Sequence, residues 1–400
     1  MLKGKTVVLG VTGSIAAYKI ASLASMLVKA HCDVHVIMTR NATNFINPIT
    51  FETLTNHKCI VDTFDRNFEF QVEHVSLAQQ ADVMMIAPAS ANVIGKVAHG
   101  IADDMLTTTI MACPGKVIFS PAMNVHMFEN PILQDNLEIL RKYGYEIVEP
   151  AVGYLACGDT GAGKMPEPET LYQYILRELA CEKDMKGLRV MVTAGPTQEA
   201  IDPVRYITNH SSGKMGYAIA RRAMLRGADV TLVSGPTALE PVPFVKMVPV
   251  VTAQEMFEAV RDHLDEQDIL IKSAAVADYR PASVSEEKVK KTEGDMSISL
   301  ERTQDILGYV AEHRREDQVI CGFSMETQNM LENSRKKLTK KKLDMIAANN
   351  VKDEGAGFAT DTNLITIITK KEERALPLMT KEEAAHELLS YILSYRAEKR

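Results

Sequence analysis

The sequence has few cysteines for its length, and none of them lies near another. The six stand at positions 32, 59, 113, 157, 181 and 321 of a 400-residue chain. Because no CxxC pair occurs, neither a zinc ribbon nor a dithiol redox motif is predicted. Scattered cysteines in a chain of this length are typical of reduced, cytoplasmic proteins. No apolar run approaches the roughly 20 residues that a membrane helix needs, so we expect no membrane span.

A strong excess of one charge is also missing. The 45 Lys and Arg residues against 52 Asp and Glu residues give a net charge of −7 at pH 7. This mildly acidic balance does not favour a nucleic-acid partner, which usually requires a basic surface. The hydrophobic fraction of 46% argues against a disordered chain. The length predicts two to three domains of about 150 residues each.

The first half of the chain has the pattern of a parallel α/β domain. An apolar, β-branched run at 5–11 precedes a glycine turn, a helical pattern at about 15–30 and a second strand pattern at Asp33–Met38. Buried strands are also expected at Val83–Ala87 and Lys116–Ser120. A strand–helix–strand unit implies parallel strands, so the predicted fold class is α/β.

The second half repeats this pattern. A strand at 188–194 is followed by a helix at 214–226 and a strand at 230–233. The stretch 195–213 between them is expected to be a long loop, and such loops are usually functional or disordered. Further strands are expected at 268–272, 318–323, 344–348 and 364–369, with a closing helix from about 380. The polar stretch after Cys181 separates two Rossmann-like domains, 1–184 and 185–400.

Small residues follow the strands of the first half, where ligands bind in open α/β sheets. The turn Gly13-Ser14-Ile15-Ala16 precedes a helix, and backbone N–H groups there can approach an anion. The fingerprint GxGxxG is absent from the string GVTGSIAA, so phosphate binding and simple tight packing both stay open. Pro88–Asn92 would suit a phosphate or a ring edge, although a helix cap by Ser90 is the alternative.

The second half has a stronger candidate for phosphate binding. Asn209–Gly216 places two serines, a lysine and two glycines at the start of a helix. This composition suits a phosphate, although no Walker A motif is present. Beyond the strand at 268–272, Asp278 would hold Mg²⁺ on a nucleotide and Lys288 would neutralise phosphate charge.

Other residues have ordinary structural explanations when they are taken alone. A single histidine such as His74 is more often structural than catalytic. Cys157 lies in the glycine-rich stretch 155–168, which we expect to be a flexible loop, and most loop cysteines have no function. Six of the eight residues at 335–342 are basic, a pattern that a solvated helix face explains.

Five segments, taken in order, resemble one family: PAMN, ACGDTGAGKMPEP, AGPTQEAIDPVR, NHSSGKMG and SAAVADYRP. The whole chain resembles the bacterial bifunctional phosphopantothenoylcysteine decarboxylase/phosphopantothenate–cysteine ligases of coenzyme A synthesis. The resemblance implies an FMN-dependent decarboxylase domain of flavodoxin-like fold at 1–184, followed by a CTP-dependent ligase domain at 185–400. Small-molecule substrates are implied: 4′-phosphopantothenate, cysteine and CTP.

For the first half, the resemblance implies that His74 is the active-site histidine, Asn124 holds the substrate carboxylate and Cys157 is the proton donor. A carboxylate beside a thiol has no electron sink, and the flavin supplies the redox chemistry that makes one. The FMN-binding positions implied by the resemblance are Gly13, Ser14, Ile15, Ala16, Thr39, Pro88, Ala89, Ser90 and Asn92.

For the second half, the resemblance implies that CTP activates 4′-phosphopantothenate as an acyl-cytidylate, which the amine of cysteine then attacks. Asn209 and Lys288 are implied as catalytic residues, Arg205 and Asn209 as substrate-binding residues, and Asp278 as the ligand of a bridging Mg²⁺. The implied nucleotide-binding positions are Ser273, Ala274, Asp278, Lys288, Asp305, Ile306, Leu307, Phe323, Lys337 and Lys341.

The sequence departs from the family pattern at three positions. Phe128 replaces a usual Trp, Lys164 replaces an expected Arg, and Gln304 replaces a usual Pro. The family also implies a homo-oligomer, and a dodecamer would satisfy trimeric decarboxylase and dimeric ligase contacts together. The alternatives are a single-activity flavoprotein oxidoreductase with an NAD(P)-binding second domain, and a non-catalytic FMN-binding scaffold. The missing GxGxxG argues against the first, and the presence of His74, Asn124 and Cys157 argues against the second.

Overall fold

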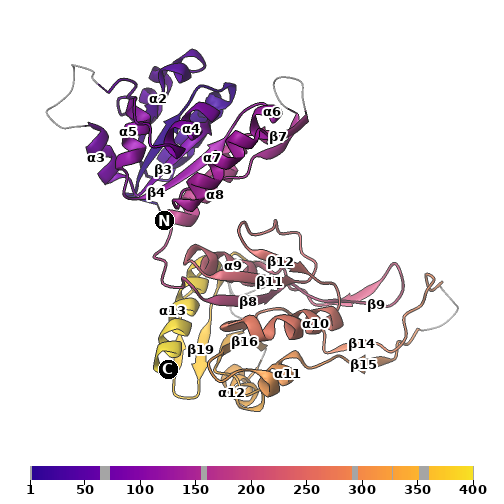
Figure 1. Cartoon of the computed structure of the whole chain (residues 1–400). Helices are drawn as coiled ribbons and strands as arrows, with labels where there is room; N and C mark the ends of the chain where they lie inside the picture. Colours follow the sequence, from indigo (N-terminus) through magenta and orange to yellow (C-terminus); the bar gives the residue numbers. More distant parts are fainter. Residues whose placement is uncertain are drawn as a thin grey trace. The chain divides into compact units, whose positions relative to one another are not determined.

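A computed structural model describes residues 2–63, 73–154, 160–290, 296–326, 328–350 and 360–399. The chain divides into two compact units, Met1–Cys181 and Glu182–Arg400, close to the boundary expected at 184/185 (Figure 1). Both units are α/β, as the sequence predicts. Within the described ranges, no helix combines the length and apolarity needed to cross a membrane.

The first unit is built on a parallel sheet whose strands are buried on both faces. All seven residues of its central strand are buried, which is what helices on both faces of a sheet produce. The strand order β2-β1-β3-β4-β5 is that of flavodoxin-like folds, with the reversal between β1 and β3. The strands are β1 Thr6–Val11, β2 Asp33–Met38, β3 Val83–Ala89, β4 Lys116–Pro121 and β5 Glu146–Ile147.

Alternating side chains of these strands pack against two sets of helices. Val8, Met84 and Phe119 join one core with α3 Glu73–Gln80, α4 Ala91–Ala98, α5 Met105–Ala112 and α7 Pro131–Lys142. The other set of helices consists of α1 Tyr18–Lys29, α2 Pro48–Thr55 and α8 Pro168–Leu179, and α1 packs against both of the others. Short 3-10 turns at η1 Ile15–Ala17 and η2 Arg40–Asn44 follow β1 and β2.

The stretch 155–168 is not the simple flexible loop that its composition predicts. Thr160–Lys164 forms β7, which pairs antiparallel with β6 Ala151–Tyr154. Gly163 (φ +126°) lies so close to the segment before α6 Val125–Phe128 that an added Cβ would stand 2.5 Å from the carbonyl oxygen of Met123. Residues 155–159, which include Cys157, lie outside the described residues.

The second unit contains an eight-stranded sheet in the order β12-β11-β8-β13-β16-β17-β19-β20. Its first six strands are parallel and follow the dinucleotide-fold order 3-2-1-4-5-6, with the reversal between β8 and β13. The strands are β8 Arg189–Ala194, β11 Asp229–Ser234, β12 Lys246–Pro249, β13 Ile269–Lys272, β16 Val319–Glu326, β17 Met345–Asn350, β19 Thr366–Thr369 and β20 Glu373–Ala375.

Helices again cover this sheet in two sets. The helices α9 Lys214–Leu225 and α13 Lys381–Lys399 pack against each other. A separate core joins Met191, Leu270 and Ile346 of the sheet with α10 Ala253–His263, α11 Ile306–His313 and α12 Met330–Lys340. A 3-10 turn, η3 Leu264–Glu266, extends α10, and β18 Thr362–Asn363 pairs with β21 Met379–Thr380.

Two hairpins project from the second unit, on the right of Figure 1. The predicted loop 195–213 contains the first of them, in which β9 Gln198–Ala200 pairs with β10 Tyr206–Thr208. The second, which we call the arm, runs from β14 Tyr279–Pro281 to β15 Leu300–Arg302 and carries Lys288. The long loop expected from the sequence is therefore an ordered hairpin.

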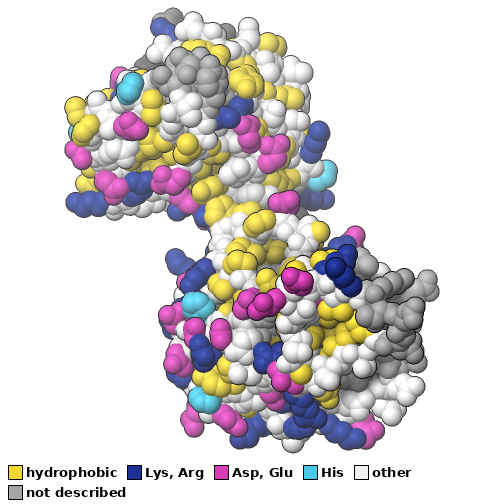
Figure 2. All heavy atoms as spheres, turned by 90° about the vertical axis from the view of Figure 1, so that its right-hand side faces the viewer, with side chains coloured by type: hydrophobic (Ala, Val, Ile, Leu, Met, Phe, Trp, Pro, Cys, Tyr) yellow, Lys and Arg dark blue, Asp and Glu magenta, His cyan; other side chains and the backbone are white. Residues whose placement is uncertain are grey.

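Acidic and basic side chains are interspersed on the face of each unit that Figure 2 shows, with apolar side chains between them. This mixture agrees with the small net charge of −7. On that face the surface has the ordinary polar character of a globular protein.

We predict that Gly216→Ala destabilises the protein, because α9 packs directly on the end of β8. An added Cβ at Gly216 would lie 2.5 Å from the Cβ of Ala194 and 3.2 Å from the carbonyl oxygen of Thr193. Such overpacking should cost about 1–3 kcal/mol and lower the melting temperature by several degrees.

The matched control is Gly95→Ala in α4, where the added Cβ would meet the Asn136 amide at an ordinary 3.5 Å. This variant should be neutral or more stable by up to about 1 kcal/mol. Differential scanning calorimetry of the two variants gives the comparison, and equal melting temperatures would contradict the packing argument.

Candidate functional site

The first unit has a cavity of about 1030 Å³ at the carboxyl ends of β1 and β3, where the strand order reverses. Four of the predicted cofactor residues line it: Gly13, Thr39, Ser90 and Asn92. The other five, Ser14, Ile15, Ala16, Pro88 and Ala89, lie in the same two segments without lining the cavity. Its position is the one that open α/β sheets use for ligands.

A buried threonine holds the two cavity segments together. The Thr12 hydroxyl donates to the Pro88 carbonyl oxygen at 2.7 Å and accepts from the Ser90 backbone N–H at 2.9 Å. An added Cβ at Gly13 would lie 2.8 Å from the Cβ of Asn41, so a side chain there would crowd the cavity wall. Ser90 begins α4, but within the described residues its side chain makes no capping hydrogen bond.

Charged groups that the sequence analysis missed also line this cavity. Lys96 lies one helical turn after Asn92 on α4, a spacing that could have identified it. Its ammonium lies 2.7 Å from Asp103 and 3.5 Å from Asp104. The hydrogen bond to Asp103 raises the pKa of Lys96, so the lysine stays charged beside the cavity. Arg40, Asn41 and Met127 are further lining residues.

Of the three predicted catalytic residues of the first half, the structure describes His74 and Asn124. His74 is half-buried near the start of α3, and the residues 64–72 before it lie outside the described ranges. Asn124 caps α6, and its side-chain oxygen accepts from the His126 backbone N–H at 2.9 Å. Cys157 is not described. The described lining of the cavity includes neither His74 nor Asn124.

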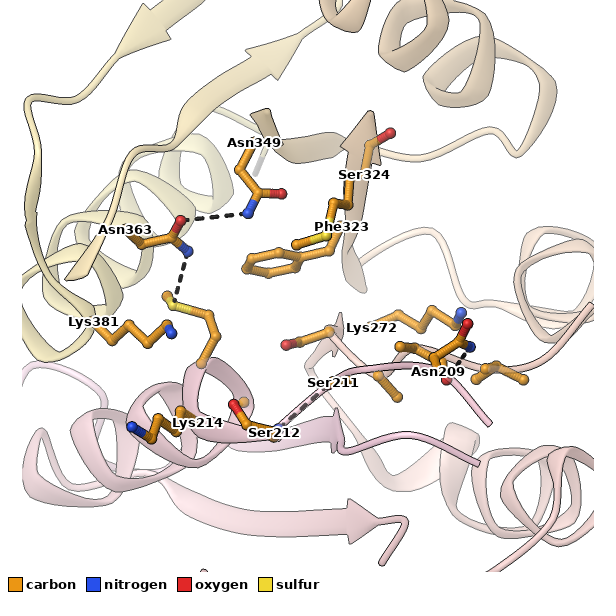
Figure 3. Close-up of a pocket in the computed structure, with 18 of the residues that line it drawn as sticks. Asn209, Ser211, Ser212, Lys214, Lys272, Phe323, Ser324, Asn349, Asn363 and Lys381 are labelled. Carbon is orange, nitrogen blue, oxygen red and sulfur yellow. Dashed lines mark hydrogen bonds between the residues drawn. The ribbon is translucent and has the colours of Figure 1, made fainter. Parts of the chain in front are cut away.

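The second unit has two adjoining cavities, of about 440 and 380 Å³, at the carboxyl ends of its parallel strands. Figure 3 shows the first, between the start of α9, the end of β13 and the facing strand β16. Predicted residues line both: Asn209, Ser273, Ala274 and Phe323 the first, Asp305, Ile306, Leu307 and Lys341 the second, and Asp278 and Lys337 the two together. The basic run 335–342 is therefore partly cavity wall and partly solvated helix face.

Lys272 is the main residue of these cavities that the sequence analysis missed. It ends the apolar strand β13 and lines both cavities (Figure 3). Burial, followed by the charge of Lys337, lowers the pKa of Lys272 to about 8, although Asp278 and Asp305 oppose the shift. The amine can therefore gain or lose its proton near neutral pH.

Hydrogen bonds hold three further charged groups of the two cavities, Lys337, Lys341 and Asp305. The Lys337 ammonium donates to the Phe323 carbonyl oxygen at 2.9 Å. Lys341 pairs with one oxygen of Asp305, whose other oxygen accepts from the Gly308 backbone N–H at 3.0 Å at the start of α11. Burial acts to raise the pKa of Asp305, but these bonds and the Lys341 charge lower it overall.

Two predicted ligase residues lie outside the described lining of both cavities. Lys288 is exposed on the arm, and Arg205 is exposed at the end of the β9–β10 turn. Arg205 donates to the buried Asp202 carboxylate through its Nε at 3.0 Å and to the Val289 carbonyl oxygen at 3.0 Å. Asp202 also accepts from the Val289 backbone N–H at 3.1 Å. The arm is thus fastened next to Lys288.

Comparison with known proteins gives matches along the whole chain. A family model described as "Flavoprotein" matches residues 1–180, and one described as "DNA/pantothenate metabolism flavoprotein C-terminal domain" matches 185–395. The chain is 47% identical over 396 residues to the coenzyme A biosynthesis bifunctional protein CoaBC of Bacillus subtilis (strain 168), covering 98% of this chain and 97% of that protein.

The chain is also 43% identical over 401 residues to CoaBC of Escherichia coli (strain K12), covering 100% of this chain and 99% of that protein. Among solved structures, that of the C-terminal domain of a CoaBC protein is 47% identical and covers 52% of this chain and 95% of its own, with a TM-score of 0.45.

We predict that the Lys272 amine takes up a proton when a nucleoside triphosphate binds next to it. The amine is largely neutral above its pKa of about 8, and a bound polyanion favours the charged form. At about pH 9, binding of CTP should therefore take up most of one proton, and affinity should fall between pH 7 and 9.

Calorimetry in two buffers of different ionisation enthalpy measures this uptake. Lys272→Arg should abolish it, because arginine stays charged at every accessible pH. Lys337→Arg is the matched control and should leave it in place. Equal uptake by wild type and Lys272→Arg would contradict the assignment.

Proposed function

This chain belongs to the family of coenzyme A biosynthesis bifunctional proteins, and we propose that it catalyses two reactions of coenzyme A synthesis, one on each unit. The first unit would decarboxylate 4′-phosphopantothenoylcysteine, and the second would ligate 4′-phosphopantothenate to cysteine. The observation that carries the proposal is that each unit has its own cavity at a strand-order reversal, lined by the predicted residues. The oxidoreductase alternative is not favoured, because the relatives that match the whole chain are named as bifunctional biosynthesis proteins.

The cavity of the first unit fits FMN. Its volume of about 1030 Å³ accommodates a cofactor of that size. Gly13 and Ser90 line the cavity, and Lys96 would supply a cation for the phosphate of the cofactor. Met127 would contact the flavin ring through its apolar side chain. When bound, the flavin supplies the redox chemistry that a carboxylate without an electron sink needs. Asn124 would hold the substrate carboxylate and Cys157 would return a proton to the product carbon.

The cavities of the second unit suit nucleotide activation of a carboxylate. In the proposed reaction, a carboxylate oxygen of 4′-phosphopantothenate attacks the α-phosphorus of CTP and pyrophosphate leaves. The amine of cysteine then attacks the acyl carbon and CMP leaves. Lys272, Lys337 and Lys341 would balance the triphosphate charge. The exposed Asp278 carboxylate, which lines both cavities, would hold Mg²⁺ together with phosphate oxygens.

We extend the proposal to the setting in which the protein works. We infer a cytoplasmic protein from its scattered cysteines. We also infer a homo-oligomer, with a dodecamer as the form that combines trimeric and dimeric contacts. Light scattering of the purified protein tests the assembly, and a monomer would contradict it.

The direct test is incubation of the purified protein with 4′-phosphopantothenate, cysteine, Mg²⁺ and either CTP or ATP, followed by mass spectrometry. We expect CTP-dependent formation of 4′-phosphopantetheine, which requires both activities. If only phosphopantothenoylcysteine accumulates, the decarboxylase assignment is wrong or the flavin has been lost, and flavin absorbance separates these cases. No product from folded protein with either nucleotide would refute the ligase assignment, and failure to decarboxylate supplied phosphopantothenoylcysteine would refute the other.

Substitution of one asparagine in each unit should separate the two activities. Asn209 donates to the Ala275 carbonyl oxygen at 3.0 Å at the edge of the first ligase cavity. Asn209→Asp removes that donor and adds a negative charge, so ligation should fall by about 100-fold or more. Decarboxylation of supplied phosphopantothenoylcysteine should not change. Asn124→Asp is the reciprocal control, and parallel losses of both activities in either variant would contradict the separation.

The attachment of the arm gives a further test of the ligase. Hydrogen bonds from Arg205 hold the pKa of the Asp202 carboxyl well below its usual range, so it accepts as an anion. Asp202→Asn weakens these charge-assisted bonds and frees the Lys288 segment, and ligation should fall by about 10–100-fold. Assay of both activities checks this, with decarboxylation expected to stay constant.

The control for that variant is Asp262→Asn, which breaks an exposed pair with Arg261. Surface pairs of this kind contribute little, so ligation should be unchanged. An Asp202→Asn enzyme with wild-type ligation would show that the arm needs no fastening.

A further inference from the structure

Three metal-ligating side chains meet at the start of β2, away from the cavity of the first unit. The Asp33 carboxylate lies 3.1 Å from Nε2 of His35 through one oxygen and 2.7 Å from Nε2 of His57 through the other. The two imidazole rings are stacked, with centroids 4.2 Å apart and planes 25° from parallel. One ligand atom from each residue lies within 4.8 Å of the others.

The fold holds these three side chains in place. Asp33 and His35 are two residues apart on β2, so they project from the same face of the strand. His57 follows Asn56, which ends α2 in the left-handed conformation. Just beyond it, Ile60 bridges to the free edge of β2, donating to the Val36 carbonyl oxygen at 3.0 Å. Two secondary elements and a backbone bridge therefore present the ligands to one point.

We infer that Asp33, His35 and His57 form a binding site for a first-row divalent transition metal, of which Zn²⁺ fits best. Two imidazole nitrogens and one carboxylate oxygen form a donor set between hard and soft. Such a set suits these ions, whereas Mg²⁺ and Ca²⁺ prefer oxygen ligands alone. Metal–ligand bonds of about 2.0–2.2 Å require the ligand atoms to move inward by less than about 1 Å. Asp33 and His57 are 47% and 40% exposed, which leaves them free to move and leaves open coordination positions for water.

The site is separate from the proposed flavin cavity. Asp33 begins β2, whereas Thr39 lines the cavity just beyond the end of the same strand. Six residues of extended chain span about 20 Å. A metal here would fasten the segment after α2 to the edge strand of the sheet, without taking part in the chemistry of either cavity.

The test uses full-length protein that has been treated with EDTA and dialysed, titrated with Zn²⁺ by calorimetry. We expect saturable binding of Zn²⁺ that His57→Gln and Asp33→Asn each weaken by about 100-fold or more. Zn²⁺ should raise the melting temperature of wild type and not of these variants, and Mg²⁺ should not produce that difference. His99→Gln, which removes an exposed histidine from another helix end, is the matched control and should bind like wild type.

Substitution with Co²⁺ gives an independent readout, because its visible absorption reports nitrogen and oxygen ligands. The absorption of the wild-type complex should be lost in His35→Gln. The inference is overturned if stripped wild type shows no saturable binding of Zn²⁺, or if the three variants bind it as tightly as wild type. In either case the cluster is only a hydrogen-bonded link between β2 and the segment after α2, and the proposed function is unaffected.

Discussion

Each cavity depends on the constraint that parallel strands in one sheet end at the same edge. The segments that leave those strands must separate where the strand order reverses, and they leave room for a ligand there. The reversal lies between β1 and β3 in the first unit and between β8 and β13 in the second. The strands on either side of each reversal are buried on both faces, so packing holds their ends in place. The short polar segments that follow these strands are therefore anchored at one end.

In both units, a threonine hydroxyl forms a hydrogen bond between the two segments that separate at the strand-order reversal. In the first, the buried hydroxyl of Thr12 accepts from the backbone N–H of Ser90 across the reversal. In the second, Thr193 accepts from the Ala274 N–H at 3.2 Å, and Thr197 accepts from the Ala277 N–H at 3.0 Å. A threonine hydroxyl can satisfy a backbone donor that has left the sheet, where no neighbouring strand is available. The segments that line the cavities are therefore held by side chains as well as by the sheet.

Sequence reasoning predicts the elements with strong local signals and misses those that depend on distant contacts. The strand Asp33–Met38 has the predicted bounds because its apolar residues Val34 and Val36–Met38 are β-branched or bulky and polar residues follow directly. The sequence predicts a loop at 195–213 because β9 and β10 have only three residues each, too few for an alternating apolar pattern to mark the hairpin. Lys272 was missed because it ends an apolar strand and nothing in its neighbours marks it. His57 lies next to Asp33 because the segment after α2 pairs with the edge of β2 at Ile60, a contact that no local pattern encodes.

The cations of the second unit divide into two groups by how they are held. Lys272, Lys337 and Lys341 enter the cavities from a strand and a helix end, so their positions are fixed before any ligand binds. Lys288 lies on the arm, which is attached next to it by two hydrogen bonds of the Val289 backbone, one with the Asp202 carboxylate and one with the Arg205 guanidinium. Fixed cations suit the ground-state charge of a triphosphate, whereas a cation on an arm can follow charge that develops as a phosphate bond breaks. The chain that leaves Asp202 also forms β10 and continues to Asn209. In the proposed ligase, the Asp202 carboxylate would therefore help to position Lys288, while Asn209 is held by its own hydrogen bond to the Ala275 carbonyl oxygen.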